Sequence, residues 1–326
     1  MNRRDTVFAL LALGAVPLAA EAQQERKVYR IGYLHAEAAS PHYRSLFDAL
    51  RSDLRNLGYV EGKNIVIEAR WADGIYGRLP DLAAELVRLK VDVLVTHGSK
   101  ASLAAKRATT TIPIVMAVTA DAVAYGLVTS LAQPGGNITG CSLITSGFNE
   151  KRLEFLKEVM PRIAHVAVLL NPANTSSDQE LKSIKAAAKS LKIELQPFEV
   201  RGSQEFDRTF SEIAKLRVDA IVLQSDTMFT ANGKKIAAFA ASKKIPSAGA
   251  REYAEAGGLI GYAQNTLELY HRTADFVDRI LKGAKPADLP VEQPTKIELV
   301  VNLKTAKALG ITIPQSILVR ADQVIE

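Results

Sequence analysis

The sequence predicts two α/β domains of similar, Rossmann-like fold, each built on a doubly wound parallel sheet. Strand-like and helix-like segments alternate along almost the whole chain, which is typical of a parallel sheet covered by helices on both faces. The stretch ELVRLKVDVLV at 85–95 aligns without gaps on EIAKLRVDAIV at 212–222. Such an echo indicates a structural repeat, and a length of 326 residues is natural for two domains.

In the first half, apolar runs predict strands and amphipathic spacing predicts helices. The first helix begins with an N-cap serine and a proline, Ser40-Pro41, and ends at Gly58. The sequence PGGN at 134–137 predicts a turn before the last strand of this half. Strands are expected over 28–34, 64–71, 91–96, 112–118 and 138–143, and helices over 41–57, over 79–89, from Ser99 onward, and out of TADAVAYG at 119–126 to near Leu131.

The second half repeats this alternation. Both halves return to a strand that starts with Ile-Pro, at 112–113 and 245–246, and a linker with three prolines at 282–294 precedes the last strand and helix. Strands are expected over 165–170, 193–200, 218–226, 245–250, 257–263 and the first part of 297–311, and helices over 149–160, 179–191, 206–216, 231–241, 267–281 and the rest of 297–311.

The charge distribution predicts an ordinary solvated surface. The net charge is +6, and no block of like charges stands out, because Lys and Arg alternate with Asp and Glu along the helices. We therefore expect no nucleic-acid partner. The single cysteine, Cys141, cannot form an internal disulfide, and its apolar strand ITGCSL predicts a small buried residue.

Residues 1–22 are predicted to be a cleaved signal peptide. Arg3-Arg4 form a basic start, an apolar run follows at 7–20, and AEA at 20–22 matches a cleavage site that gives a mature start at Gln23. The absence of cysteine at this site predicts that the product is not a lipoprotein. Secretory and twin-arginine export both fit Arg3-Arg4. We expect a soluble exported protein.

Several segments resemble the ABC-transporter substrate-binding proteins of the tryptophan/tyrosine type, which have the type I periplasmic-binding-protein fold. The resemblance covers almost the whole mature chain, and its segments are specific only together. They are LGYVEGKNIVIEARWADG at 57–74, RLPDLAAELVRLKVDVLV at 78–95, GLVTSLAQPGGNITG at 126–140, KRLEFLKEVMP at 151–161, VAVLLNPAN at 166–174, EAGGLIGY at 255–262, and the stretch from DRILKGAKPADLP to ALGITIP at 278–314. The chain departs from the usual pattern at Lys100, where many members have proline, and at Ala122, where many have proline after aspartate.

The resemblance implies a periplasmic solute-binding protein that captures a small ligand between two lobes. One lobe would comprise 23–140 with 263–292, and the other 141–262 with 293–326. Hinge strands would lie near 139–142, 261–263 and 290–294. It further implies an inner-membrane ABC permease with its ATPase as partner, and we expect a monomer without a cofactor.

Candidate ligand-binding residues follow the strands, because ligands of such folds bind between the carboxyl edges of the sheets. Gly98, Ser99 and Lys100 start a helix there, and helix N-terminal amides favour a carboxylate. Each candidate also has a structural reading, as an N-cap, a turn cap or a packed ring. The remaining candidates are His35, His97, Thr119, Asp121, Asn171, Asn174, Gln224, Asp226, Arg251 and Tyr262.

These residues favour a small carboxylate-bearing or amino-acid-like ligand, aromatic ligands included, rather than a sugar or a metal ion. Asp121 or Asp226 would accept an ammonium group, and Tyr262 would supply a flat wall. His35 and His97 lack a second residue at metal-ligand spacing. The motifs of hydrolases, nucleotide-binding loops and zinc proteases are absent, so an exported enzyme is the weaker alternative. A sensor module for a membrane receptor would use the same cleft and stays open.

Overall fold

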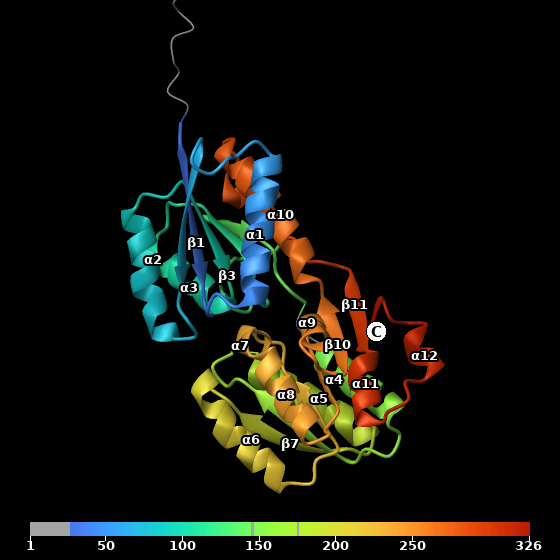
Figure 1. The fold of residues 1–326 in the computed structure, drawn as a ribbon. Helices are drawn as coiled ribbons and strands as arrows, with labels where there is room; N and C mark the ends of the chain where they lie inside the picture. The colour runs from blue at the N-terminus through green and yellow to red at the C-terminus, as the bar shows by residue number, and fades with distance from the viewer. Residues whose placement is uncertain (1–26, 145–146, 175) are drawn as a thin grey trace, which may run out of the picture.

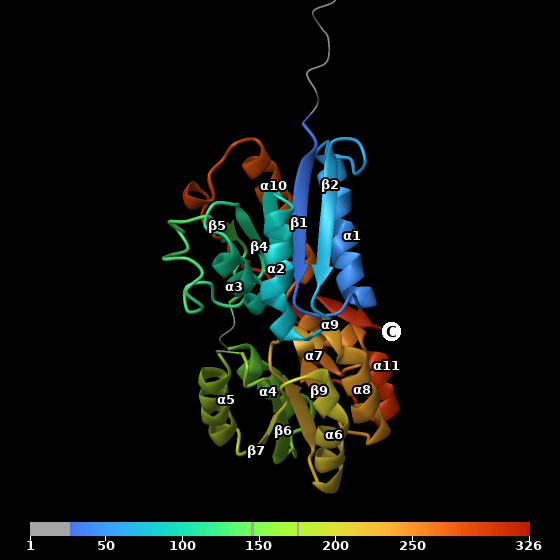
Figure 2. The same cartoon turned by 90° about the vertical axis from the view of Figure 1, so that its left-hand side faces the viewer.

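The computed structural model describes residues 27–144, 147–174 and 176–326. The predicted signal peptide lies outside the described residues. Two lobes are stacked end to end, each with a central sheet between helices (Figures 1 and 2). The order of strands is β2-β1-β3-β4-β5 in one sheet and β12-β11-β10-β9-β8-β6-β7 in the other. Two α/β domains are therefore confirmed.

The N-lobe is the lobe built on the five-stranded sheet. All its strand pairs are parallel. Its elements are β1 Tyr29–His35, α1 Pro41–Asn56, β2 Ile65–Trp71, the 3-10 helix η1 Tyr76–Arg78, α2 Leu79–Arg88, β3 Val93–His97, α3 Ser99–Ala108, β4 Ile114–Val118 and β5 Ile138–Gly140. The helix α10, Thr266–Leu281, comes from the far end of the chain but shares the N-lobe core, where Leu269, Tyr270 and Phe276 pack with residues such as Ile31 and Val95.

The C-lobe is built on the seven-stranded sheet. Its helices and 3-10 segments are α4 Phe148–Val159, α5 Ser177–Ser190, η2 Ser203–Glu205, α6 Phe206–Lys215, α7 Thr227–Ala231, α8 Gly233–Ser242, α9 Arg251–Glu255, α11 Leu303–Leu309 and α12 Gln315–Leu318. Its strands are β6 His165–Leu170, β7 Glu194–Glu199, β8 Ala220–Leu223, β9 Ser247–Gly249, β10 Ile260–Gln264, β11 Ile297–Asn302 and β12 Gln323–Ile325. A further 3-10 segment, η3 Pro286–Asp288, lies between α10 and β11.

The sequence echo at 85–95 and 212–222 is a structural repeat. β3 lies between β1 and β4, and β8 lies between β6 and β9 at the matching place. The shared aspartate explains part of the likeness. Asp92 donates its N–H to the carbonyl of Arg30 and accepts from the N–H of Arg30 through Oδ2, at 2.7 Å each. Asp219 forms the same pair of bonds with His165, at 2.7 and 2.9 Å.

Two local predictions were wrong. β10 pairs with β11 antiparallel, so the C-lobe sheet is mixed, because the chain re-enters this lobe from the N-lobe end. No helix forms over 121–131. Asp121 instead accepts from the N–H groups of residues 123 and 124 through Oδ1, and the turn ends at Gly126, whose φ is +62°. The helix expected at 231–241 is present as α8, and the short helix α7 before it was not expected.

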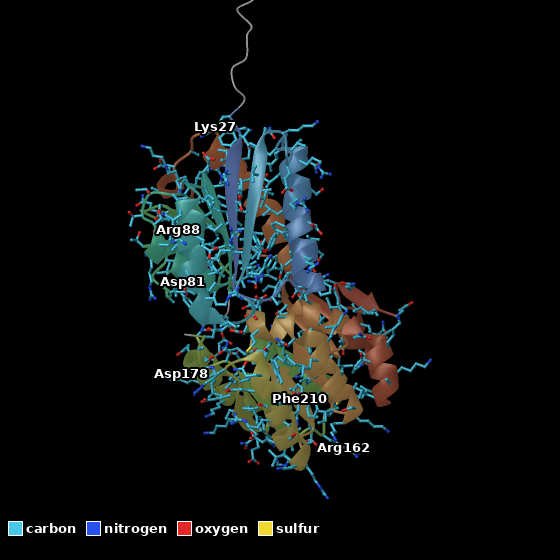
Figure 3. The ribbon with its side chains drawn as sticks, turned by 60° about the vertical axis from the view of Figure 1, so that its left-hand side comes forward. Lys27, Asp81, Arg88, Arg162, Asp178 and Phe210 are labelled. Carbon is cyan, nitrogen blue, oxygen red and sulfur yellow. The ribbon has the colours of Figure 1, made fainter. Side chains whose placement is uncertain are left out.

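The chain passes between the lobes three times, after β5, after β10 and before β11. The first and third passages lie side by side, since Ser142 donates to the carbonyl of Glu292 and Glu292 donates to that of Gly140, at 2.9 Å each. The second passage follows β10 at residues 264–265, whereas the predicted hinge at 261–263 lies within that strand. Charged residues such as Asp81 and Arg88 of α2 and Asp178 of α5 point outward (Figure 3). Within the described segments, no helix is both long and apolar enough to cross a membrane.

Candidate ligand-binding site

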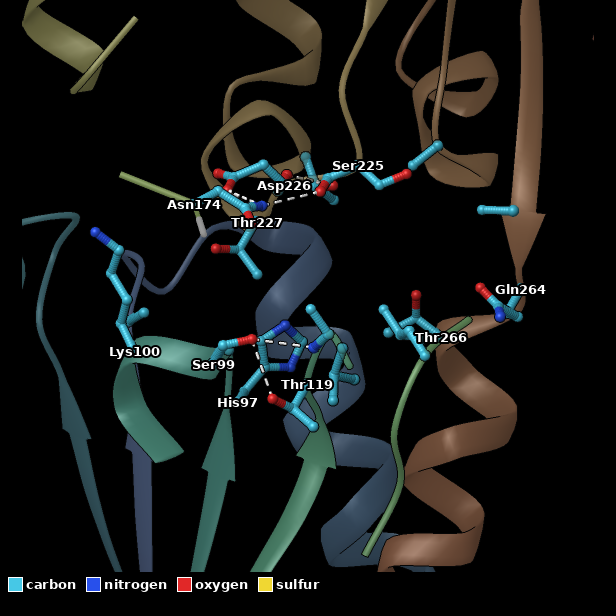
Figure 4. A pocket seen from close by; sticks show the side chains of 18 of the residues that line it. His97, Ser99, Lys100, Thr119, Asn174, Ser225, Asp226, Thr227, Gln264 and Thr266 are labelled. Atoms are coloured by element: carbon cyan, nitrogen blue, oxygen red, sulfur yellow. Dashed lines mark hydrogen bonds between the residues drawn. The ribbon is translucent and has the colours of Figure 1, made fainter. Parts of the chain in front are cut away.

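A cavity lies where the carboxyl ends of the two sheets face each other (Figure 4). Its N-lobe wall comes from α1, η1 and the ends of β3 and β4, and its C-lobe wall comes from the segments after β6, β8, β9 and β10. The lining residues are Ala36, His42, Tyr43, Tyr76, His97, Gly98, Ser99, Lys100, Val118, Thr119, Ala120, Tyr125, Leu143, Ile144, Phe148, Asn174, Ser225, Asp226, Thr227, Thr230, Ala250, Glu252, Ala263, Gln264 and Thr266.

The N-lobe wall is mainly aromatic. The rings of His97 and Tyr43 meet edge to face at 5.0 Å, and His42 lies 5.2 Å from Tyr43. Behind them, His35 stacks on His97 at 4.2 Å and lies 4.7 Å from Trp71. Such a wall offers flat, polarisable surface to a ligand ring.

The two stacked histidine rings of this wall are uncharged at neutral pH. Burial lowers the pKa of His97 to about 3 and holds the pKa of His35 well below its usual range. Nδ1 of His35 accepts from the N–H of Glu37 at 2.9 Å, so the proton of the neutral ring is on Nε2.

A chain of buried hydroxyls orients His97. The hydroxyls of Tyr33 and Tyr270 are 2.7 Å apart, and Tyr270 is 2.8 Å from Nδ1 of His97. Within the described residues, the Tyr33 hydroxyl contacts only Tyr270. All three groups are satisfied when Tyr33 donates to Tyr270 and Tyr270 donates to Nδ1. We therefore assign the proton of His97 to Nε2, as a donor on the cavity wall.

The C-lobe wall is polar and charged. Asp226 caps α7 by accepting from the N–H of Met228 at 2.9 Å, and it also accepts from the amides of Asn171 and Asn174. Burial raises the pKa of its carboxyl group. Glu252 accepts from the hydroxyl of Thr266 at 2.7 Å through Oε1. Two carboxylates therefore border the cavity on this side.

Ser99 and Lys100 border the cavity from the start of α3. Oγ of Ser99 accepts from the Thr119 hydroxyl and from the N–H of Ala120, at 3.0 Å each. The ammonium of Lys100 lies 4.1 Å from the centre of the Tyr76 ring. Burial lowers the pKa of Lys100, while Asp226 and Glu37 oppose that shift.

Hydrogen bonds join the two lobes across the cleft. Tyr43 donates to the carbonyl of Thr227 at 2.8 Å, and Tyr125 donates to Oδ1 of Asn174 at 2.8 Å. The hydroxyl of Thr227 lies 3.4 Å from Glu37, a carboxyl group of the N-lobe that is only 3% exposed. The lobes are thus in contact at the cleft in this conformation.

The structure brings together seven of the predicted residues: His97, Gly98, Ser99, Lys100, Thr119, Asn174 and Asp226 line the cavity. Four others lie just behind or beside it, or turn away from it: His35 behind His97, Asn171 and Gln224 beneath the Asp226 loop, and Asp121 in its exposed turn.

Arg251 and Tyr262 lie elsewhere, because neighbouring groups in the C-lobe bind their side chains. Arg251 pairs with Glu298 at 2.5 Å and with Glu255 at 2.7 Å. The ring of Tyr262 packs on Phe148 and Phe155 at 5.8 and 5.1 Å.

Sequence reasoning missed several lining residues. Glu252 directly follows Arg251, and its position just after a strand was the available signal. His42 and Tyr43 lie at the start of α1, directly after the Ser40-Pro41 cap, so the end of β1 and this cap point to them. Tyr76 and Phe148 follow no strand end directly and gave no signal. Over the described segments, no three His, Cys, Asp or Glu side chains are arranged to hold a metal ion.

The chain matches a sequence model described as ABC transporter substrate binding protein over residues 40–325. It is 27% identical over 257 residues to the tyrosine-binding protein of Clostridioides difficile (strain R20291), covering 78% of this chain and 74% of that protein.

Two solved structures are similar over 91% of this chain. A conserved domain protein from Vibrio cholerae has a TM-score of 0.83 at 29% identity, with all of that chain covered. An ABC domain from Streptococcus pneumoniae in complex with L-Trp has a TM-score of 0.82 at 28% identity, with 99% of that chain covered.

Proposed function

The chain belongs to the family of ABC transporter substrate binding proteins, and from this premise we propose that its ligand is an aromatic amino acid or a close zwitterionic relative. Its role is that of a solute-binding protein. The observation that carries the proposal is the division of the cavity into an aromatic N-lobe wall and a charged C-lobe wall. A ligand with a flat ring at one end and charged groups at the other matches this division.

The aromatic wall supports a ring-bearing ligand. His97 presents a neutral ring because burial keeps it uncharged, and the Tyr43 ring lies beside it with its hydroxyl used on Thr227. A neutral imidazole attracts an apolar ring without the desolvation cost that a charged imidazole would add.

The charged wall supports an ammonium group on the ligand. Glu252 uses one oxygen on Thr266, which leaves its second oxygen for the ligand, whereas Asp226 uses both oxygens on protein donors. We therefore propose Glu252 as the main ammonium partner, with Asp226 adding negative potential. The relatives that bind tyrosine and L-Trp support the same ligand class.

The partner and the location follow from the family. We propose that the protein works in the periplasm as a monomer, without nucleic acid, after cleavage behind Ala22, and that it delivers its ligand to an inner-membrane permease and its ATPase. N-terminal sequencing of the exported protein tests the cleavage, with Gln23 as the expected first residue.

A thermal-shift panel tests the ligand class. L-tryptophan, L-tyrosine, L-phenylalanine, benzoate, sugars and nucleosides are compared at saturating concentration. The true class stabilises the protein by RT ln(1 + [L]/Kd), about 2.7 kcal/mol at a hundredfold excess over Kd. Aromatic amino acids should shift the transition most, and a shift from sugars or nucleosides alone would refute the proposal.

A matched pair of variants tests the ammonium partner. Glu252→Gln should weaken the affinity for the aromatic amino acids by about tenfold or more, the usual scale for breaking a buried charge pair. Glu255→Gln, on the same short helix but exposed and paired with Arg251, should leave the affinity unchanged. Equal effects of the two variants would contradict the role of Glu252.

A further inference from the structure

Arg152 of α4 is a fully buried guanidinium group behind the C-lobe wall. Its Nε and Nη2 both donate to the carbonyl of Tyr262, at 3.1 and 2.8 Å. Nη1 donates to the carbonyl of Leu223 at 2.9 Å and to Oδ1 of Asn149 at 2.8 Å. Nη2 also donates to Oγ of Ser225 at 2.9 Å. All these acceptors are neutral, and no carboxylate of the described residues is within ion-pair distance.

The positive charge of Arg152 has no directly paired carboxylate among the described residues; Glu180, Glu252 and Glu150 act on it from further away. Burial lowers its pKa to about 10, so the group stays charged at neutral pH. The carboxyl group of Glu180 is one residue further away, where it accepts from the amide of Asn149 at 2.8 Å. Burial raises the pKa of Glu180 to about 7, so part of its negative charge is lost at neutral pH. A buried cation without a directly paired counter-ion is costly and calls for a reason beyond packing.

Ser225 transmits this charge to the cavity. It lines the cavity directly after β8, and its oxygen accepts from Arg152. Because the guanidinium occupies the oxygen, the hydroxyl hydrogen points away from Arg152. Within the described part of the chain, no acceptor takes that hydrogen. A free O–H backed by a buried cation is a site for an anionic oxygen.

We propose that Arg152 is a positioning residue that aims the Ser225 hydroxyl into the cavity, so that the ligand carboxylate docks on Ser225. The proposal rests on the proposed function and adds to it an orientation of the ligand in the cavity. The carboxylate and the ammonium of the ligand both lie against the C-lobe, at Ser225 and Glu252, and the ring lies against the N-lobe. The carboxylate is then not bound at Ser99, where the sequence placed it.

Calorimetric titration with paired probes tests this orientation of the ligand. L-tryptophan and indole-3-propionate carry the carboxylate, and tryptamine lacks it. Ser225→Ala should weaken both carboxylate probes about tenfold and tryptamine less than twofold. Ser99→Ala, the matched hydroxyl on the N-lobe side, should not change the preference for carboxylate. The inference is overturned when Ser225→Ala affects all probes equally, or when Ser99→Ala abolishes the preference instead.

Variants of Arg152 test its role behind Ser225. Arg152→Met should abolish binding of the carboxylate probes while tryptamine binding remains. Arg152→Lys should restore part of the preference for carboxylate probes over tryptamine. A merely structural role predicts that all probes weaken together, and this result overturns the inference. If Arg152→Met does not fold, the Ser225→Ala and Ser99→Ala pair still decides. If wild-type protein binds no probe and none of the panel of aromatic amino acids, the proposed function itself fails and the inference fails with it.

Discussion

Glu37 is a carboxyl group sealed between the lobes. Tyr76 donates to it at 2.8 Å and Thr227 lies 3.4 Å away. Burial raises its pKa from 4.5 to about 7; nearby Asp226 adds to the shift, and the hydrogen bond from Tyr76 and the charge of Lys100 oppose it. The folded protein therefore holds this proton more tightly than the unfolded chain does. Its contribution to stability is complete below pH 4.5 and is lost as the pH rises towards 7.

Replacing Glu37 by glutamine should remove this pH dependence. Between pH 4.5 and 8, the wild-type free energy of unfolding should fall by roughly 3 kcal/mol relative to Glu37→Gln, since each pKa unit corresponds to about 1.4 kcal/mol. Urea denaturation at several pH values measures the difference, and Glu268→Gln, an exposed change, serves as control. Parallel pH profiles of wild type and Glu37→Gln would show that Glu37 is not the responsible group.

Single residues also show the limit of prediction from sequence. Arg251, Glu252 and Tyr253 all follow one strand, and the sequence analysis chose Arg251. Successive side chains on a helix point in directions about 100° apart around its axis. Only Glu252 borders the cavity, while Arg251 pairs with Glu298 and Tyr253 contacts Ser247 at 2.8 Å. The choice among the three depends on helix orientation, which the local sequence does not contain.

At the scale of elements, the strands were predictable because their residues are buried on both faces. The prediction of the repeated strands β3 and β8 was correct for a further reason. Asp92 and Asp219 each tie the start of one of these central strands to its neighbour. The loop at 121–131 was mistaken for a helix because its apolar residues Ala122, Leu127 and Val128 are buried against the N-lobe core without helical hydrogen bonds. Burial by tertiary contact imitated the pattern of an amphipathic helix.

Gly140 ends β5 at the first passage between the lobes, and we expect this element to tolerate no side chain there. Its φ is +121°, and an added Cβ would lie 2.3 Å from the carbonyl oxygen and 2.5 Å from the nitrogen of Met116. Gly140→Ala should lower the free energy of unfolding by roughly 3 kcal/mol, from backbone strain and overpacking together.

Gly136 provides the control for this substitution. It lies four residues earlier, and an added Cβ would meet nothing within 4 Å. Gly136→Ala should change stability by less than about 1 kcal/mol. Urea denaturation of both variants gives the comparison, and an equally mild effect at Gly140 would mean that the end of β5 can shift away from β4.

At the scale of the whole molecule, we expect the lobes to rotate as bodies about the three passages. Two passages are hydrogen-bonded to each other through Gly140, Ser142 and Glu292. The third lies beside them, since the amide of Gln264 donates to the carbonyl of Ile144 at 3.2 Å. Motion of this kind bends a few residues and leaves both sheets intact. The hinges expected from the sequence at 139–142 and 290–294 fall at the passages after β5 and before β11. The passage after β10 was misplaced, because it depends on where β10 ends, and a strand end is set by its neighbours in the sheet.

The Tyr43 hydroxyl stabilises the closed arrangement specifically, because it donates to the carbonyl of Thr227 in the other lobe. Tyr43→Phe removes this bond and keeps the ring. Since the bond exists only when the lobes meet, its loss of about 1 kcal/mol should appear as an approximately fivefold weaker affinity for L-tryptophan or L-tyrosine. It should not lower the stability of either lobe.

Tyr253→Phe is the matched control, because this hydroxyl is also buried but contacts Ser247 within one lobe. It should lower the free energy of unfolding by about 1 kcal/mol and leave the affinity unchanged. Calorimetric titration and urea denaturation together separate the two effects, and small-angle scattering should show less compaction by a fixed, subsaturating ligand concentration for Tyr43→Phe than for wild type. If Tyr43→Phe binds as tightly as wild type, closure does not depend on this bond, and ligand contacts alone hold the lobes together.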